Sequence, residues 1–417
     1  MISIAWKSIC NRWPTALLAV LAISMSVALI LTVEKVRRDA RNSFTQTVSG
    51  TDLIVGARSG AIQLLLYSVF RIGNATNNIS WESVEEIRNR SAVKWLIPIS
   101  LGDSHAGFRV LGTNHDYFTH YLYGDKQPLQ LAAGDIFTDV FDAVIGSEVA
   151  AKLGYEVNQS IVVAHGTGSV GLVTHDRQPF RVSGILRPTG TPVDRAIHVS
   201  LQGIEAMHVD WRNGATVKGE GTDADTIRKM ELQPKAVTAL LVGLNSRAAV
   251  FREQRAINTY RAEPLLAVLP GVALQELWSL VSVAEMALFI VSVCVVIAGL
   301  VNLISVLLAG LNERRREMAV LRSAGARPGH VFLLLCIEST VLTLGGILAG
   351  LVLHYVLTGL GAVYMQNRFG VSIGMSLPDA TDLKILLAIA VSGLLAGSLP
   401  ALQAYRKSLA DGLSQRL

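Results

Sequence analysis

The sequence predicts an α-helical integral membrane protein with four transmembrane helices, cytoplasmic N- and C-termini, and a large mixed α/β extracytoplasmic domain between the first and second spans. Hydrophobic residues make up 51% of the chain and charged residues only 17%, whereas an ordinary soluble domain carries about 25% charged residues. The apolar residues gather in four long blocks. Lys and Arg flank these blocks in the pattern that orients helices in a bilayer.

The first block, residues 14–33, contains no charged residue and has the length of about 20 residues that a helix needs to cross a bilayer. Lys7 and Arg12 lie before it, which indicates that residues 1–13 are cytoplasmic. A cleaved signal peptide is the alternative interpretation. We favour an uncleaved span, because the block is long for the apolar part of a signal peptide and no small-x-small cleavage site with a polar mature start is visible.

Residues 34–285 form the predicted extracytoplasmic domain together with its stalk helices. The charged run at 34–41 continues the first span, and residues 273–289 carry apolar side chains at helical spacing before the second span. Between the stalks, residues 236–244 have the pattern of a buried strand, and residues 148–154 predict a helix. The domain has no cysteine, so its own hydrophobic core must stabilise it.

One apolar run in this domain, Leu64 to Phe70, is too short to cross a bilayer. It has two interpretations. The run is either a helix of the domain core or an exposed apolar segment that meets lipid or a partner. In the second case the contact residues are Leu64, Leu65, Leu66, Tyr67 and Phe70.

The histidines are the only candidates for a metal site in this domain, which holds seven of the nine. A site needs three or four ligands that converge, and the scatter of these residues along the chain supports no specific set. We therefore expect surface histidines and no metal. The seven residues are His105, His115, His120, His165, His175, His198 and His208.

Three further apolar blocks predict the remaining spans, at residues 286–311, 331–356 and 385–404. The loop at 312–330 contains five arginines, which indicates a cytoplasmic location. Because successive spans cross the membrane in opposite directions, two further segments can be assigned to a side. They are a second extracytoplasmic loop at 357–384 and a cytoplasmic tail at 405–417 that contains Arg406, Lys407 and Arg416.

The third span carries one carboxylate and a face of small residues. Glu338 lies near its start, where it either pairs with an arginine of the cytoplasmic side or lines a moving interface, or is solvated near the lipid headgroups. Gly346 and Gly350 are four residues apart and so share one helix face. Such a face lets two helices approach closely.

Several classes of function are excluded by missing motifs. The chain has no GxxxxGK[ST] phosphate loop, so it is not its own ATPase by that route. It also lacks HExxH, GxSxG and CxxC, and shows no nucleic-acid recognition module despite its net charge of +5. Charged residues are nearly absent from the spans, which argues against a secondary transporter with a polar site at the midplane.

Three segments are distinctive: the cytoplasmic stretch NERRREMAVLRSAGA at 312–326, the third-span stretch IESTVLTLGGILAGLVL, and the C-terminal GSLPALQAYRKSLADGL. They resemble the MacB/FtsX-like ABC permease family (type VII), which includes the lipoprotein-releasing permeases. The resemblance is strong from about residue 280 to residue 417. From 34 to 280 it is a resemblance of layout alone.

The resemblance implies a homodimer of permeases in the bacterial inner membrane, bound to two cytoplasmic ATPase subunits. ATP and Mg²⁺ would bind to those ATPases, and this chain would bind no cofactor. The loop after the second span would dock on the ATPase through a short coupling helix. The residues that the resemblance assigns to this contact are Arg314, Arg315, Glu317, Met318, Leu321, Arg322 and Gly325.

The leading functional hypothesis is a non-catalytic permease subunit. It would couple ATP hydrolysis by a separate ATPase to movements of the periplasmic domain, for export or extraction of a substrate at the inner membrane. A periplasmic adaptor or lipoprotein and membrane lipids are further expected partners, and nucleic acid is not. One alternative is a scaffold that transports nothing and controls a periplasmic enzyme by mechanotransmission. Another is a permease involved in metal-ion handling.

Overall fold

The computed structural model describes residues 9–47, 49–165, 173–174, 178–212, 215–216, 222–313, 325–369 and 376–413. The chain divides into two compact units. The helical unit comprises Met1–Asp39, Ser282–Asn367 and Ile373–Leu417. The α/β unit comprises Ala40–Val281 and Arg368–Ser372.

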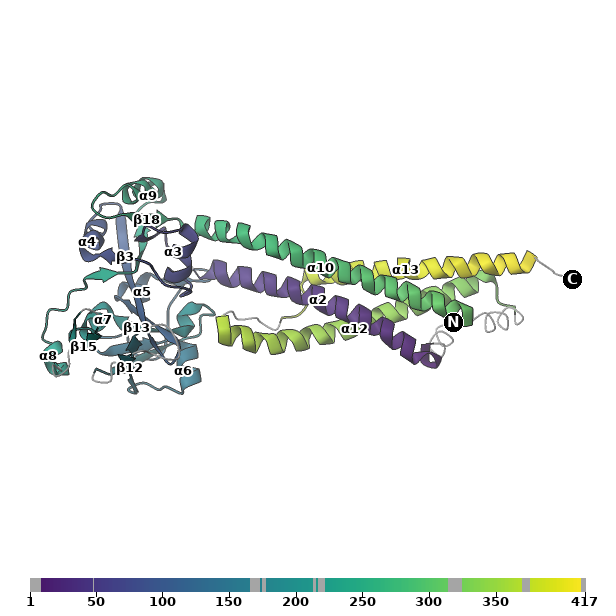
Figure 1. Ribbon diagram of the computed structural model, residues 1–417, viewed down its shortest axis with the longest axis horizontal. Coiled ribbons are helices and arrows are strands. Elements are labelled where there is room, and N and C mark those ends of the chain that lie inside the picture. Colours follow the sequence, from purple (N-terminus) through teal and green to yellow (C-terminus); the bar gives the residue numbers. More distant parts are fainter. Residues whose placement is uncertain are drawn as a thin grey trace. The chain divides into compact units, whose positions relative to one another are not determined.

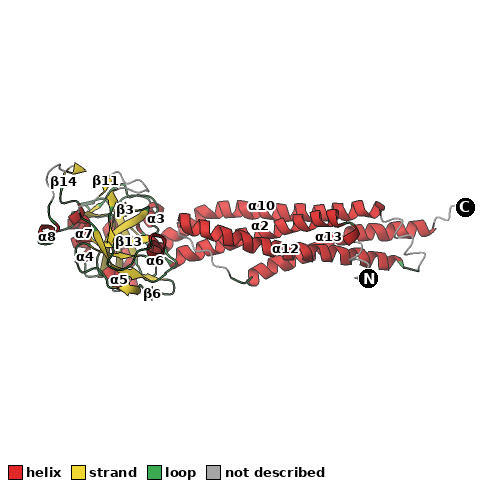
Figure 2. Cartoon of the chain, turned by 90° about the horizontal axis from the view of Figure 1, so that it is seen from below, coloured by secondary structure: helices red, strands yellow, loops and turns green. Residues whose placement is uncertain are grey.

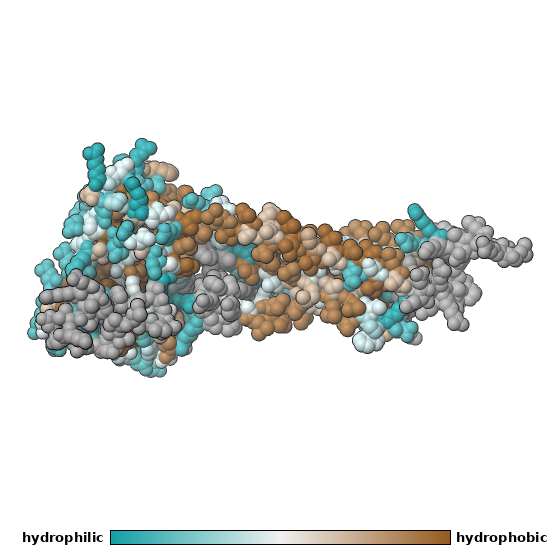
Figure 3. Space-filling model, viewed as in Figure 1, coloured by the Kyte–Doolittle hydropathy of each residue, from teal (hydrophilic) through white to brown (hydrophobic). Residues whose placement is uncertain are grey.

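Four long helices build the helical unit and run side by side in both ribbon views (Figures 1 and 2). Each contains an apolar segment long enough to cross a membrane, and hydrophobic side chains predominate on the face of these segments that Figure 3 shows. The prediction of four apolar membrane helices is therefore confirmed. The helices are α2 (Trp13–Gln46), α10 (Pro270–Glu313), α12 (Pro328–Phe369) and α13 (Ala380–Leu413).

The helices extend beyond the predicted spans. The apolar segments are Trp13–Asp39, Pro270–Gly310, Pro328–Ala362 and Ala380–Arg406. Helix α2 includes the charged run at 34–41, and α10 includes residues 273–289, so both predicted stalk segments are helical continuations of their spans. Pro400 lies inside α13 and does not end it, although proline removes one backbone hydrogen bond from a helix.

The α/β unit is built on a sheet that contains, among the described residues, twelve strands (yellow in Figure 2). Its main order is β18-β1-β17-β3-β4-β13-β8-β12-β7. In that order the strands span Leu265–Val268, Leu53–Ala57, Ala239–Leu244, Val93–His105, Phe108–Thr113, Ala196–Ser200, Asp142–Ile145, Phe180–Leu186 and Leu131–Gly134. The pairs β13–β4 and β12–β8 are parallel, and the other pairs along this order are antiparallel.

The remaining strands are short. Strands β9 (Ser160–Ile161), β10 (Ala164–His165) and β11 (Val173–Thr174) branch from the main sheet. Three two-stranded sheets complete the set: β14 (Trp211–Arg212) with β15 (Ala215–Thr216), β16 (Ala236–Val237) with β2 (Ile79–Ser80), and β5 (Leu122–Tyr123) with β6 (Gln127–Pro128).

Strand β3 organises the α/β unit because its thirteen residues pair with different strands at its two ends. Its first part pairs with β17, and its second part pairs with β4 and β10. One hydrophobic cluster lies around β1 and β17, another around β8 and β12, and a third joins residues from both regions. The buried strand expected at 236–244 is present as β17, in which every residue is buried.

Short helices cover the sheet. They are α3 (Ala61–Ser68), α4 (Trp81–Arg88), α5 (Asp116–His120), α6 (Ser147–Leu153), α7 (Leu201–Met207), α8 (Ala224–Ile227) and α9 (Val250–Asn258), with 3₁₀ turns at Pro192–Arg195 and Arg247–Ala249. The helix expected at 148–154 is α6, which ends at Gly154 with φ +67°. This left-handed conformation favours glycine.

The apolar run at 64–70 belongs to the core of the α/β unit. Leu64, Leu65 and Tyr67 are at most 1% exposed, and Phe70 is also buried. Leu66 is partly buried and packs against the same cluster. The interpretation as an exposed lipid or partner segment does not fit this arrangement. Helix α3 lies on the sheet. Packing there removes its apolar side chains from water without any contact with lipid or a partner.

The residues that follow α2 belong to the α/β unit and are hydrogen-bonded within it. Tyr121 Oη donates to the carbonyl of Thr47 at 2.6 Å. The Ser49 N–H donates to the Leu122 carbonyl at 3.2 Å, and Ser49 Oγ donates to the Gly124 carbonyl at 2.7 Å. The chain that leaves α2 is thus bonded to the residues around β5.

Candidate functional site in the helical unit

The predicted coupling residues lie mostly outside the described residues, namely Arg314, Arg315, Glu317, Met318, Leu321 and Arg322. The structure describes the last predicted member, Gly325, which is exposed and has φ +91°. It precedes α12, which begins at Pro328. A left-handed residue at this point turns the chain into the helix, and glycine adopts that conformation without strain.

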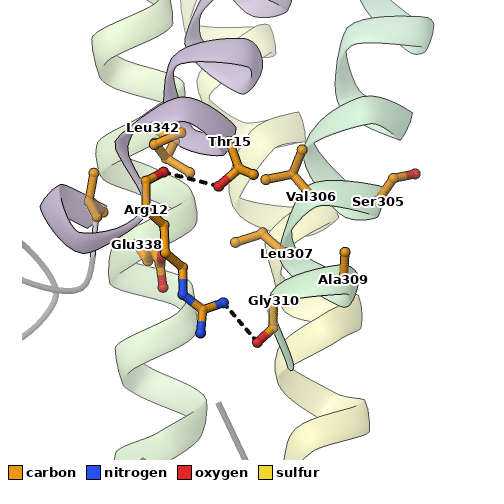
Figure 4. A pocket seen from close by; sticks show the side chains of 11 residues that line it. Arg12, Thr15, Ser305, Val306, Leu307, Ala309, Gly310, Glu338 and Leu342 are labelled. Carbon is orange, nitrogen blue, oxygen red and sulfur yellow. Dashed lines mark hydrogen bonds between the residues drawn. The ribbon is translucent and has the colours of Figure 1, made fainter. Parts of the chain in front are cut away.

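Glu338 is buried against protein at its position on α12, with 4% of its surface exposed. It lines a pocket of about 270 Å³ together with Arg12, which directly precedes α2, Thr15 of α2 and Ser305 of α10 (Figure 4). Glu338 therefore shares a pocket with an arginine of the predicted cytoplasmic side. The interpretation of Glu338 as a group solvated among headgroups does not agree with this burial.

Arg12 connects the start of α2 to the end of α10. Its Nη1 donates to the carbonyl of Gly310 at 2.9 Å, across 298 residues of sequence (Figure 4). Carbonyl groups in the last turn of a helix lack intrahelical donors and carry partial negative charge. A guanidinium is well suited to such a carbonyl, so this bond stabilises the helix end that leads into the predicted coupling loop.

Close packing of glycine joins the middle of α2 to α12. A Cβ atom placed on Gly346 would lie 2.6 Å from the Cβ of Ile23, and one on Gly350 would lie 2.6 Å from the Cβ of Val27. Such separations are far below van der Waals contact. The predicted small-residue face is therefore a helix–helix contact, in which only glycine allows the observed approach.

Small hydroxyl residues make similar contacts between other helix pairs. Ser339 Oγ of α12 donates to the Gly393 carbonyl of α13 at 2.9 Å. Ser26 Oγ of α2 donates to the Val295 carbonyl of α10 at 3.0 Å. Hydroxyl groups in a bilayer gain by bonding to backbone carbonyls, because lipid offers no alternative partner. These buried hydroxyl groups therefore stabilise the packing of the helices against one another.

A second polar cluster lies farther along α2, toward the α/β segment of the sequence. Arg38 donates to Asp382 at 2.7 Å and also contacts Asp379, so α2 is bonded to the start of α13. Lys35 Nζ donates to Ser376 Oγ at 2.8 Å. Thr32 Oγ1 lies 2.9 Å from Nδ1 of His354, which adds α12 to the contact.

Asp379 has a double role in this cluster. Its carboxylate accepts the N–H groups of Thr381 and Asp382, each at 2.9 Å, and so caps α13. Hydrogen bonds from Arg38 and from the Asp382 N–H lower its pKa to about 2. Sequence reasoning missed this cluster, although an Asp before an apolar helix is a recognisable capping signal. Nothing local in the sequence indicates that Arg38 is the partner.

No group of three His, Cys, Asp or Glu side chains that could hold a metal occurs in the part of the chain that the structure describes. Several histidines have local partners instead. His105 lies 2.6 Å from the Val162 carbonyl and 2.8 Å from Tyr155 Oη, and His115 lies 2.9 Å from the Phe137 carbonyl. The side chains of His165 and His175 lie outside the described residues.

His198 differs from the expected surface histidines because it is completely buried. Its Nδ1 lies 3.1 Å from the Val144 carbonyl, and its ring packs against Tyr117. Burial, together with the positive charge of nearby Arg71, lowers the pKa of His198 to about 3. It is therefore a neutral core residue at physiological pH.

In the α/β unit, Asp142 is a buried carboxylate that accepts several hydrogen bonds. Its oxygens accept from the Asp139 N–H at 2.9 Å and from Arg181 Nη2 at 2.8 Å. Burial opposes ionisation of this group, but the hydrogen bonds from Asp139, Arg181 and the Thr138 N–H outweigh it and lower the pKa of Asp142. The carboxylate fixes the start of β8 in the sheet.

We expect Asp142→Asn to destabilise the α/β unit in a pH-dependent way. Because the folded pKa lies below the unfolded value of about 3.9, the ionised carboxylate stabilises the fold above that value and loses this effect as the pH falls toward the folded pKa. The variant should lower the free energy of unfolding by about 1–3 kcal/mol at pH 7, and by less at pH 3.

Denaturant unfolding of the full chain in detergent, followed by tryptophan fluorescence at both pH values, measures this difference. Asp225→Asn is the matched control, since the side chain of Asp225 is 78% exposed. An equal loss of stability at pH 7 and pH 3 would show that the charge of Asp142 does not matter.

Comparison with known proteins gives two family matches that together cover most of the chain. Residues 16–248 match the MacB-like periplasmic core domain, and residues 289–409 match the FtsX-like permease C-terminal domain. The first match contains most of α2 and most of the α/β unit. The second contains most of α10, α12 and α13.

Individual relatives are distant. The lipoprotein-releasing system transmembrane protein LolC of Neisseria meningitidis is 25% identical over 263 residues, which cover 60% of this chain and 56% of that protein. The pyoverdine export ATP-binding/permease protein PvdT of Pseudomonas savastanoi is 22% identical over 349 residues, which cover 79% of this chain and 47% of that protein. The chain thus spans about half the length of the curated relatives it matches.

Among solved structures, the periplasmic region of MacB from Actinobacillus actinomycetemcomitans covers 55% of this chain and 94% of its own, at 13% identity and a TM-score of 0.34.

Proposed function

Since the chain belongs to the MacB/FtsX-like permease family, we propose that it is the permease subunit of an ABC machine in which ATP hydrolysis by a separate cytoplasmic ATPase moves the α/β unit. The family is one of multi-pass permeases of the bacterial inner membrane. In this proposal the chain itself is non-catalytic, and ATP and Mg²⁺ bind to the ATPase partner.

The observation that carries the proposal is the continuity of two helices. Helix α2 runs from a membrane span into the residue range of the α/β unit, and α10 runs from that range into a span. An α-helix is a stiff element because successive turns are joined by backbone hydrogen bonds within the helix. A displacement of the spans would therefore be transmitted along both helices. At the end of α2 it would reach the residues that are hydrogen-bonded to Thr47 and Ser49.

The contact with the ATPase is proposed at the arginine-rich loop between α10 and α12. Met318 and Leu321 are three residues apart and would share one face of a short helix, with Arg314 and Arg322 available for acidic groups of the ATPase. Arg12 supports this position, because it bonds to Gly310 shortly before the loop begins.

The spans fit a permease that extracts or exports its substrate at the outer face of the membrane better than one that passes the substrate between its helices. The buried hydroxyls of Ser26 and Ser339 bond to neighbouring helix backbones, which leaves them suited to packing. The named relatives release lipoproteins or export pyoverdine. Because these cargoes differ, we name no single substrate. The proposed assembly is a homodimer of permeases with an adaptor or lipoprotein partner.

A scaffold that controls a periplasmic enzyme by the same movements is the second candidate. The same helix continuity supports it, since mechanotransmission requires no cargo. A permease involved in metal-ion handling is the other alternative, and no group of three His, Cys, Asp or Glu that could hold a metal occurs among the described side chains.

Affinity purification of the tagged chain from bacterial membranes, followed by mass spectrometry, tests the proposal. We expect a P-loop ATPase at a stoichiometry near one per permease. A periplasmic hydrolase that remains bound would favour the scaffold, and an adaptor or lipoprotein would favour extraction. Absence of any ATPase, with the permease monodisperse and folded, would contradict the proposed function.

A further inference from the structure

Two arginines of the α/β unit lie close together without an ion pair among the described residues. Arg71 follows α3, Arg109 lies on β4, and both are partly buried. Burial and the positive charge of Arg71 lower the pKa of Arg109, so the two guanidinium groups repel each other. Like charges that are partly removed from water are costly unless a negative charge joins them.

The hydrogen bonds of Arg109 hold its side chain in place and leave its charge unmatched. The guanidinium donates to Asn74 Oδ1 at 2.9 Å and to the Gly73 carbonyl at 3.0 Å. Both acceptors are neutral. These bonds use two of the five N–H donors of a guanidinium, so Arg109 keeps donors for a ligand.

Arg71 is held in an unfavourable conformation. Its φ is +60°, which residues other than glycine rarely adopt. The guanidinium donates to the neutral Ser68 carbonyl and, at 3.4 Å, to Tyr117 Oη, while its Nε is buried and makes no hydrogen bond with the described residues. Backbone strain of this kind gathers at sites that clamp a ligand.

Asp194 is the carboxylate that affects the same tyrosine as Arg71, but it does not neutralise Arg71. The two groups change the pKa of Tyr117 in opposite directions. The oxygens of Asp194 accept the Thr189 N–H at 2.9 Å and the Gly190 N–H at 2.7 Å, and burial raises its pKa. Backbone donors therefore hold this carboxylate, and it forms no ion pair with Arg71.

A polar pocket of about 490 Å³ adjoins Arg109. It is lined by residues 74–78 and by Leu101 and Gly102. One lining residue is Asn74, which accepts the hydrogen bond from Arg109. The lining contains three asparagines and a threonine and no charged residue. Amide and hydroxyl groups can donate to and accept from the hydroxyl groups of a ligand.

We propose that Arg71 and Arg109 bind the phosphate of a phosphate monoester, whose hydroxyl-bearing organic part lies in the pocket beside them. A phosphate monoester carries about two negative charges at pH 7 and three acceptor oxygens, so it matches two guanidinium groups in charge and in hydrogen bonding. A phosphodiester or a carboxylate carries one charge and would leave one arginine unmatched. The inference concerns the α/β unit and does not depend on the proposed function.

Calorimetric titration of the purified full chain in phosphate-free buffer tests the proposal. The probes are glycerol 3-phosphate, inorganic phosphate and dimethyl phosphate, a diester with one negative charge. We expect glycerol 3-phosphate to bind about tenfold more tightly than dimethyl phosphate, the size expected for loss of one charged hydrogen bond. It should also bind more tightly than inorganic phosphate, because its hydroxyl groups reach the pocket.

Three variants assign the site. Arg109→Gln and Arg71→Gln should each weaken binding of glycerol 3-phosphate about tenfold. Asn77→Ala, in the pocket, should weaken binding of glycerol 3-phosphate and leave inorganic phosphate unchanged. Arg255→Gln is the matched control, because Arg255 is an exposed arginine of α9 that does not line the pocket. Thermal unfolding verifies that each variant is folded, and Arg109→Gln decides by itself if Arg71→Gln is not.

Dihexanoyl phosphatidic acid distinguishes the source of the phosphate, because it carries the same group on a lipid. Tighter binding than glycerol 3-phosphate, lost in Arg109→Gln, would identify a lipid headgroup, and weaker binding would identify a soluble ester.

Equal affinity for glycerol 3-phosphate and dimethyl phosphate would overturn the proposal, and so would wild-type affinity in Arg109→Gln. Inorganic phosphate that binds as tightly as glycerol 3-phosphate would overturn the assignment of an ester. None of these outcomes depends on an ATPase partner, so they are separable from the fate of the proposed function.

Discussion

The double variant Glu317→Lys, Leu321→Asp should reduce recovery of the ATPase with the tagged permease by about tenfold or more. Leu321 is expected on the apolar face of the coupling helix together with Met318, and Asp at this position would place a charge in the centre of the contact. An unpaired charge at the centre of an interface is costly because it loses water without gaining a partner. Quantitative mass spectrometry of the purified complex measures the ratio of ATPase to permease.

A matched control has the same chemical changes on the surface of the α/β unit. Met230→Asp, Glu231→Lys alters two exposed neighbouring residues and should leave the ATPase ratio unchanged. If the coupling-loop variant retained the wild-type ratio, the ATPase would have to bind elsewhere, and the role assigned to the loop would be wrong.

Leucine at Gly346 or Gly350 should disrupt the helical unit. The first atom of the new side chain would overlap Ile23 or Val27, at 2.6 Å between Cβ atoms, before the rest of the side chain is considered. Overpacking usually costs about 1–3 kcal/mol, and here the backbone of α2 would also have to move. We expect a large drop in unfolding temperature and a low yield of monodisperse protein for each variant.

Gly361→Leu provides the control on the same helix, because a Cβ atom at Gly361 meets nothing within 4 Å. This variant should behave like the wild type in size-exclusion chromatography and thermal unfolding. Equal stability of Gly350→Leu and Gly361→Leu would mean that α2 and α12 do not approach each other as closely as described.

The membrane architecture could be predicted from the sequence because its signals are local. Apolar blocks of sufficient length and the flanking arginines fixed four spans, and the family resemblance was strongest where these spans lie. The exact helix ends were less accessible. Helix α2 continues to Gln46 and α10 starts at Pro270, since charged or mixed segments outside a span can still form helix.

The apolar run at 64–70 shows where sequence patterns leave a choice open. A short hydrophobic helix has the same composition whether it packs on a sheet or faces lipid or a partner protein. Its position became clear only from the strands that it covers, which are distant in sequence. Leu64, for example, contacts the region of Gly56, where a Cβ atom would lie 2.5 Å from its side chain.

Only part of the candidate site was predicted from the sequence. Glu338 was singled out because a carboxylate within a span is costly and needs a reason. An arginine of the cytoplasmic side was one expected partner, but the sequence did not indicate which one. Arg12 and Gly310 are separated by 298 residues, and in the second polar cluster Arg38 and Asp382 are separated by 344. Contacts of this kind depend on how the helices pack, which no local pattern in the sequence specifies.

The central claim, that ATP on the cytoplasmic side moves the α/β unit, is tested most directly by a distance measurement across the chain. Spin labels are placed at Phe251→Cys in α9 and Leu387→Cys in α13, which are 72% and 65% exposed, in a variant that lacks Cys10, Cys294 and Cys336. Pulsed electron resonance then compares the complex with its ATPase without nucleotide and trapped with ATP. If ATP moves the α/β unit, the distance distribution shifts on ATP binding. Identical distributions in a complex that still binds and hydrolyses ATP would contradict it.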